Sequence, residues 1–147
     1  MIASVTFYSV VVWLHVVGVV VAFGGVFAYP LVQSALSRAG ALPAFHSTQV
    51  VVWSRVVTPA MVIVLLAGVY LASDADAWSE AWVSGGFVGM ILLFAIAGMA
   101  TSWERKAAAL APAGGAEYDA IAGRLRAAVG AAMGLVVVVL FLMVVKP

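Results

Sequence analysis

Two ionisable side chains lie inside long apolar runs of the sequence, and they are the residues best placed to do chemistry. His15 lies in the run Phe7–Val32, roughly 12 Å from its start at ~1.5 Å per helical residue, which is near the middle of a membrane. A neutral imidazole at that depth can ligate haem iron or another metal, relay a proton, or donate a hydrogen bond to a carbonyl. Arg55 lies in the run Val50–Ala72 and keeps its charge. Its guanidinium therefore either reaches the interface along its flexible stem or binds an anion.

Three further residues bear on the surroundings of Arg55 and His15. Glu104, at the end of the third apolar run, is the expected internal anion for Arg55, and a haem propionate is the alternative. Pro59, four residues after Arg55, has no N–H for the Arg55 carbonyl and predicts a kink in this helix. We expect the kink to aim Arg55 into the bundle. His46 lies in a connection between apolar runs, where we expect a loop or interfacial histidine rather than a second axial ligand.

The composition places these residues in a membrane protein. Hydrophobic residues make up 66% of the 147 residues and charged residues 9%, whereas soluble domains average about 45–50% and about 25%. So few charges cannot cover the surface of a soluble domain of this size. The net charge of +1 gives no basic field for nucleic acid, so the expected partner is the lipid bilayer. The absence of cysteine excludes disulfides, iron–sulfur clusters, thiolate zinc sites and cysteine nucleophiles.

Four apolar runs divide the chain, and each is long enough to cross a bilayer. A spanning helix needs roughly 20 apolar residues. An open sheet would leave backbone groups unpaired in lipid, and a barrel would need alternating polar positions that these valine-rich runs lack. We therefore predict an all-α fold, in which residues 1–147 form a single integral membrane domain built as a four-transmembrane-helix bundle. The predicted helices cover residues 7–32, 50–72, 82–103 and 127–145.

Basic residues predict how the bundle sits in the membrane. With Arg55 counted beside the first connection, six of the seven Lys and Arg residues belong to the first and third connections, and Lys146 alone lies on the other side. Basic connections stay in the cytoplasm. We therefore expect these two connections inside, both termini outside, and a location in the inner (plasma) membrane of a bacterial cell.

Small residues recur four positions apart along the predicted helices. The pairs are Gly18 and Ala22, Gly24 and Ala28, Gly85 and Gly89, and Gly130 and Gly134. This spacing lets helix backbones approach closely in lipid, where no hydrophobic drive brings helices together. The pairs favour packing between helices inside one bundle. Alternatively, they form the contact between two copies of the chain, so the protein partner that we expect is a second copy in a homodimer.

Two stretches of the sequence resemble a known family. They are WLHVVG (residues 13–18) followed by FGGVF (residues 23–27), and RVVTP (residues 55–59) followed by GVYL (residues 68–71). Together they resemble a family of uncharacterised bacterial integral membrane proteins with four predicted helices. That family is similar to the copper-resistance D domain and to the HemJ-type protoporphyrinogen oxidases through an L-H-x-x-G…G-G pattern in the first helix. The resemblance covers the first two helices by motif and the last two by hydropathy.

The resemblance implies a haem b group whose iron is ligated by His15. In that arrangement Arg55 is the partner of an anionic propionate. HemJ-type proteins also carry a lysine in a later helix, and here no apolar run contains one. The resemblance therefore does not extend to oxidase activity, and whether the chain is an enzyme stays open.

Three functions fit these residues. The first is a b-type haem-binding or redox-associated membrane protein that uses His15 and Arg55. The second is a small transporter or channel-like protein in which Arg55 binds an anion. The third is an accessory subunit without a ligand, in which His15 makes only an interhelical hydrogen bond. An absorption spectrum separates the first function from the other two.

Overall fold

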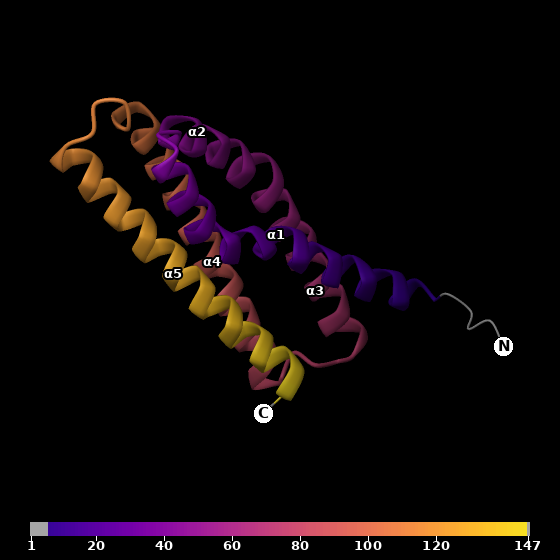
Figure 1. The fold of residues 1–147 in the computed structure, drawn as a ribbon. Coiled ribbons are helices and arrows are strands. Elements are labelled where there is room, and N and C mark those ends of the chain that lie inside the picture. Colours follow the sequence, from indigo (N-terminus) through magenta and orange to yellow (C-terminus); the bar gives the residue numbers. More distant parts are fainter. Residues whose placement is uncertain (1–5, 147) are drawn as a thin grey trace.

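The computed structural model describes residues 6–146, and this part of the chain is helical apart from short connections (Figure 1). The helices are α1 (Phe7–Arg38), α2 (Leu42–Val52), α3 (Thr58–Asp74), α4 (Ala81–Leu110) and α5 (Ala116–Val145), with a π-helical turn (Trp53–Val57) that joins α2 to α3. Since α2 and α3 form one continuous helix, there are four helices long and apolar enough to cross a membrane. This is the architecture of a multi-pass membrane protein, and the predicted all-α four-helix fold is confirmed.

Each helix extends beyond the apolar run that predicted it. The helices predicted at 50–72 and 127–145 begin at Leu42 and Ala116 instead, and the one predicted at 82–103 continues to Leu110. The observed helices of 30–33 residues measure about 45–50 Å, against about 30 Å for the hydrocarbon core of a bilayer. The additional turns therefore reach the level of the lipid head groups. The first and third connections shrink to residues 39–41 and 111–115.

Local sequence explains where the helices begin and end. The Thr6 hydroxyl oxygen caps α1 by accepting a hydrogen bond of 3.2 Å from the Ser9 backbone N–H. The chain leaves α1 through Gly40 at φ 69° and enters α5 through Gly114 and Gly115 at φ 63° and 93°. Residues with a Cβ are strained in these conformations, so the glycines fix two sharp reversals at the same end of the bundle.

Glycines allow the closest approaches between helices. The most extensive pairings are α4 with α5, α1 with α3, and α2 with α4 (Figure 1). A Cβ on Gly18 of α1 would lie 2.8 Å from Val64 Cγ2 of α3, and a Cβ on Gly89 of α4 would overlap Val139 Cγ2 of α5. These two contacts confirm that the pairs starting at Gly18 and Gly85 pack inside the bundle.

The other two small-residue pairs face outward. Gly24, Ala28, Gly130 and Gly134 are exposed, and a Cβ added at any of the three glycines would meet no other atom within 4 Å. They are therefore free of internal packing in the described chain. A homodimer that uses them stays a prediction.

The π-helical turn lies where Pro59 predicts a disturbance of the second helix. Because Pro59 has no N–H, the α-helical bond to the Arg55 carbonyl is lost. The preceding turn widens, so that the Thr58 N–H donates to the Trp53 carbonyl, and the Thr58 hydroxyl donates to the same oxygen at 2.8 Å. We expected this irregularity to aim Arg55 into the bundle. That expectation is wrong, because the Arg55 side chain is exposed.

The arrangement of the connections makes the membrane orientation testable. The first and third connections lie at one end of the bundle, and the α3–α4 connection and the end of α5 lie at the other (Figure 1). We expect a reporter that is active only in the cytoplasm to be active when inserted between Pro112 and Gly115 and inactive when fused after Lys146. The reason is the basic bias of the first and third connections. Activity after Lys146 would reverse the orientation without changing the number of helices.

Candidate functional site

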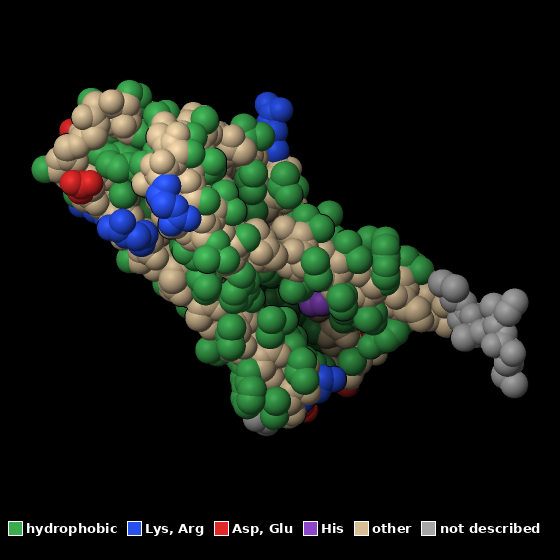
Figure 2. Space-filling view, in the orientation of Figure 1, with side chains coloured by type: hydrophobic (Ala, Val, Ile, Leu, Met, Phe, Trp, Pro, Cys, Tyr) green, Lys and Arg blue, Asp and Glu red, His purple; other side chains and the backbone are tan. Residues whose placement is uncertain are grey.

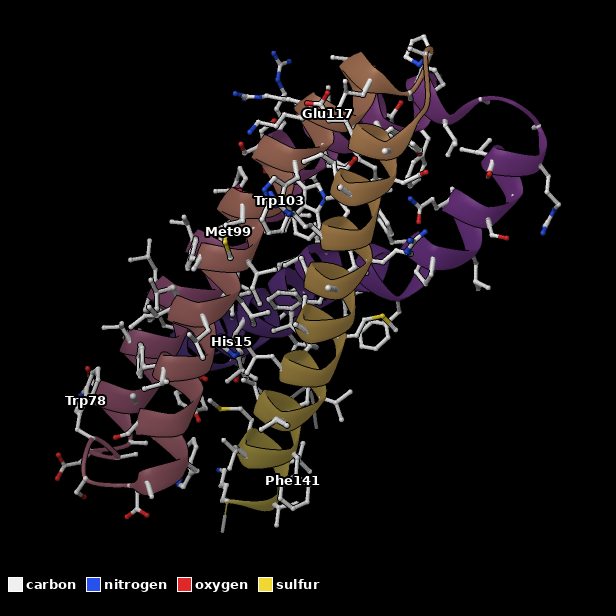
Figure 3. All side chains as sticks on the ribbon, turned by 90° about the vertical axis from the view of Figure 1, so that its left-hand side faces the viewer. His15, Trp78, Met99, Trp103, Glu117 and Phe141 are labelled. Atoms are coloured by element: carbon white, nitrogen blue, oxygen red, sulfur yellow. The ribbon has the colours of Figure 1, made fainter. Side chains whose placement is uncertain are left out.

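A groove that opens toward the α3–α4 connection and the end of α5 contains His15. Figure 3 shows His15 between Trp103 and Trp78, the latter in the α3–α4 connection. The groove has a volume of about 340 Å³, and residues from α1, α3, α4 and α5 line it. In Figure 2 it is a hollow in an apolar face, with a histidine inside and a basic side chain at its edge. The lining is mainly apolar, with His15 and Lys146 as its ionisable nitrogen bases.

The hydrogen bond of His15 determines which ring nitrogen is available. His15 Nδ1 lies 3.0 Å from the Val64 carbonyl oxygen of α3. A carbonyl can only accept, so Nδ1 carries the proton and donates it. In the neutral imidazole the lone pair is therefore on Nε2, and no hydrogen bond from the described residues occupies it. The Val64 carbonyl of α3 thus fixes both the tautomer and the orientation of the His15 ring.

The sequence builds this contact from two pairs of residues on facing helices. His15 and Gly18 are three positions apart on α1, and Val64 and Gly68 are four positions apart on α3, so each pair shares a helix face. Gly18 lets α1 approach Val64. A Cβ on Gly68 would lie 3.5 Å from His15 Cε1, an ordinary van der Waals distance, so Gly68 lies against the imidazole without being required by it. The contact between α1 and α3 therefore depends on Gly18 and the Val64 carbonyl as well as on the histidine.

The groove fits one part of the predicted haem site and not the other. Metal-ligating histidines usually donate their second ring N–H to a carbonyl or carboxylate, which is what His15 does. Arg55, however, does not line the groove. It lies nine residues before Val64, roughly 13 Å along the helix axis, and the structure does not bring it together with His15. The basic side chain at the groove is Lys146, whose Nζ lies 4.9 Å from the centre of the Trp82 ring.

A second polar cluster lies at the end of the bundle that carries the first and third connections, and it corrects two expectations. The expected ion pair of Arg55 with Glu104 is wrong, because Glu104 is 0% exposed and bonded elsewhere while Arg55 is exposed. Glu104 Oε2 lies 2.6 Å from His46 Nδ1, and Oε1 accepts a hydrogen bond of 2.7 Å from the Tyr29 hydroxyl. His46 is not a loop histidine, since it lies within α2 and is 0% exposed. On its other side, His46 Nε2 lies 3.1 Å from the Tyr118 hydroxyl.

The sequence holds a signal for this cluster. Its four residues come from α1, α2, α4 and α5, and each lies near the end of its helix that faces the first and third connections. Buried acids and imidazoles need partners, so four such groups at one end of a bundle form a natural set. Among residues 6–146, no three His, Asp or Glu side chains gather to hold a bare metal ion.

The chain's own residues are the basis for any functional assignment. The resemblance to HemJ-type proteins and the copper-resistance D domain stays a prediction that depends on the motifs around His15 and Pro59. No family model matches the chain, and neither a curated protein nor a solved structure is significantly similar to it.

Proposed function

We propose that the protein binds haem b in the groove, with His15 Nε2 as an axial ligand, and that it takes part in membrane redox chemistry. The observation that carries the proposal is the Nδ1–H bond to the Val64 carbonyl, which leaves Nε2 as a free base at the groove. Mainly apolar walls would keep water from a bound macrocycle. The haem, when bound, would supply one-electron chemistry whose potential depends on the axial ligand and the surrounding polarity.

The basic partner of a propionate differs from the one that the sequence suggested. Lys146 lines the groove and Arg55 does not, so in this proposal Lys146 balances a propionate charge. Arg55 instead extends from the π-helical turn to the surface. The alternative function, in which Arg55 binds a transported anion, gains no support from this position, because Arg55 is exposed and does not line the groove.

Haem reconstitution tests the proposal. We expect the purified wild-type protein in detergent to retain a Soret band after incubation with haem and removal of the unbound haem, and His15→Ala to retain none, because the axial ligand is removed. Arg55→Ala is the matched control, since it removes a charge outside the groove, and it should keep the band. Lys146→Ala should weaken haem binding without abolishing it, as expected for loss of one partly exposed charge.

Two results would argue against haem binding at His15. One is a wild-type protein that stays colourless after reconstitution, and the other is a His15→Ala variant that keeps the wild-type spectrum. In the first case His15 would be a structural residue that only joins α1 to α3 through the Val64 carbonyl. His15→Ala would then lower the free energy of unfolding by about 0.5–1.5 kcal/mol, as is typical for the loss of one net hydrogen bond.

A further inference from the structure

A second cavity, separate from the His15 groove, lies between α1 and α5 beside the buried cluster. Its volume is about 530 Å³. The hydroxyl-bearing rings of Tyr29 and Tyr118 form part of its wall, and both hydroxyls bond to the His46–Glu104 pair behind them. Any molecule in the cavity therefore contacts side chains that are one hydrogen bond away from a buried acid and base.

The pair and Tyr118 have the connectivity of a donor–acceptor switch. When the pair holds one proton, between Glu104 and His46 Nδ1, Nε2 is bare and accepts the Tyr118 O–H. The Tyr118 oxygen then offers only lone pairs to the cavity. When the pair gains a second proton, Nε2 carries a hydrogen whether or not Glu104 is ionised. His46 then donates to the Tyr118 oxygen, and the Tyr118 hydrogen is free to point into the cavity.

The cavity combines polar and apolar walls in a way that suits a neutral, lipid-soluble ring. Gln33, Ser34 and Tyr118 are polar residues of the wall, whereas Val129 and Met133, further along α5, are apolar. Arg126 and Asp119 also line the cavity, and their opposite charges leave the wall without a net charge that would select an ion. A neutral head group with an apolar tail satisfies both kinds of wall.

We propose that this cavity binds the head group of a lipid-soluble quinone, with one ring oxygen hydrogen-bonded to Tyr118. A quinone oxygen is an acceptor in the oxidised form and a donor in the hydroquinone form. Those are the two roles that the switch complements: the doubly protonated pair frees the Tyr118 hydrogen for a quinone carbonyl, and the singly protonated pair frees the Tyr118 oxygen for a hydroquinone O–H. The proposal does not depend on haem in the other groove.

The test uses ubiquinone with a single isoprene unit, titrated in its oxidised and reduced forms into the protein in phosphatidylcholine nanodiscs. Tyr118→Phe keeps the ring and removes the hydroxyl. We therefore expect Kd to rise roughly three- to tenfold, the worth of one hydrogen bond, for quinone where the pair holds two protons and for hydroquinone where it holds one. Tyr70→Phe is the control, because the Tyr70 hydroxyl bonds to Asp74 near the far end of α3 and lies outside the cavity. It should leave both Kd values unchanged.

A second pair of variants tests the location. Gly130 lines the cavity and Gly134 does not. A Cβ meets no other atom within 4 Å at either position. Gly130→Leu should therefore narrow the cavity and weaken binding, and Gly134→Leu, one turn further along α5, should bind as the wild type does.

The pH dependence separates the switch from a merely structural tyrosine. His46 bonds to Glu104 of α4 and to Tyr118 of α5, Glu104 also bonds to Tyr29 of α1, and Arg126 and Asp119 of α5 line the same cavity as Tyr118. As pH falls and the pair gains its second proton, quinone should bind more tightly and hydroquinone more weakly. In Tyr118→Phe, the affinities for quinone and hydroquinone should no longer change in opposite directions with pH.

Several results would overturn the proposal. The first is that neither quinone nor hydroquinone binds saturably. The second is that Tyr118→Phe or Gly130→Leu binds them with wild-type affinity. The third is that the affinities for both forms change in the same direction with pH. Preferential filling of the cavity by phosphatidylglycerol, seen as loss of quinone binding in nanodiscs that contain it, would assign the cavity to an anionic lipid instead.

Discussion

Glu104→Ala should lower the free energy of unfolding by about 3–5 kcal/mol, the largest loss that we expect from any single substitution in this protein. The carboxylate is fully buried and bonds to both His46 and the Tyr29 hydroxyl. Its removal leaves a buried imidazole and a buried hydroxyl without their shared partner, and each unpaired group adds a desolvation penalty. Unfolding by sodium dodecyl sulfate in mixed micelles, followed by circular dichroism, measures the loss.

Matched variants show whether the loss comes from the unpaired groups. Glu117→Ala removes an exposed carboxylate from the first turn of α5 and should change stability by less than about 0.5 kcal/mol. Replacing all four groups of the cluster together, as Glu104→Leu, His46→Leu, Tyr29→Phe and Tyr118→Phe, should lose less than Glu104→Ala alone, because no polar partner is left behind. If Glu104→Ala were as stable as the wild type, the hydrogen-bonded cluster would not contribute to folding.

Gly89→Ala should destabilise the protein by about 1–3 kcal/mol, because the added methyl group has no space between α4 and α5. Its Cβ would overlap Val139 Cγ2, and a β-branched valine has little freedom to rotate away in a helix. The helices would have to separate along their most extensive contact. The same unfolding assay, with retention of helix content at low denaturant, measures the effect.

Two other glycines on these helices serve as controls. At Gly86 the added Cβ would overlap Met143 Cε, the far end of a flexible side chain, so Gly86→Ala should lose less stability than Gly89→Ala. At Gly134 there is open space, and Gly134→Ala should be neutral or stabilising by up to ~1 kcal/mol through helix propensity. Equal losses at all three positions would mean that close packing of α4 on α5 is not what the glycines provide.

The number of helices and a disturbance of the second helix near Pro59 could be predicted from the sequence because both follow from local chemistry, although the expected form was a kink and the observed form is a π-helical turn. Long apolar runs have one stable conformation in lipid, and Pro59 removes a specific backbone donor wherever it stands. The outer ends of the helices could not be predicted from hydropathy. Residues 42–49 and 116–126 are too polar for the hydrocarbon core, yet they continue the helices into the head-group region.

The partners of polar residues could be predicted only in part. We expected His15 either to bond another helix or to ligate haem, and the structure shows the bond to Val64 without testing the haem. The sequence predicts that Glu104 pairs with Arg55 because each residue lies near the cytoplasmic end of its expected helix. Their pairing depends on which way each helix is rotated. That rotation places Glu104 toward His46 and Arg55 toward the surface, and it follows from tertiary packing that no short motif records.

The π-helical turn sets the angular phase between the two halves of the second membrane crossing. The half before it presents His46 to Glu104, and the half after it presents Val64 and Gly68 to His15. A π turn holds one more residue than an α turn, and each helical residue rotates the chain by about 100°. Deleting one residue there would restore a regular helix but keep only one half in register with its neighbours. Homologues should therefore keep the spacing between these two positions constant even where the residues between them change.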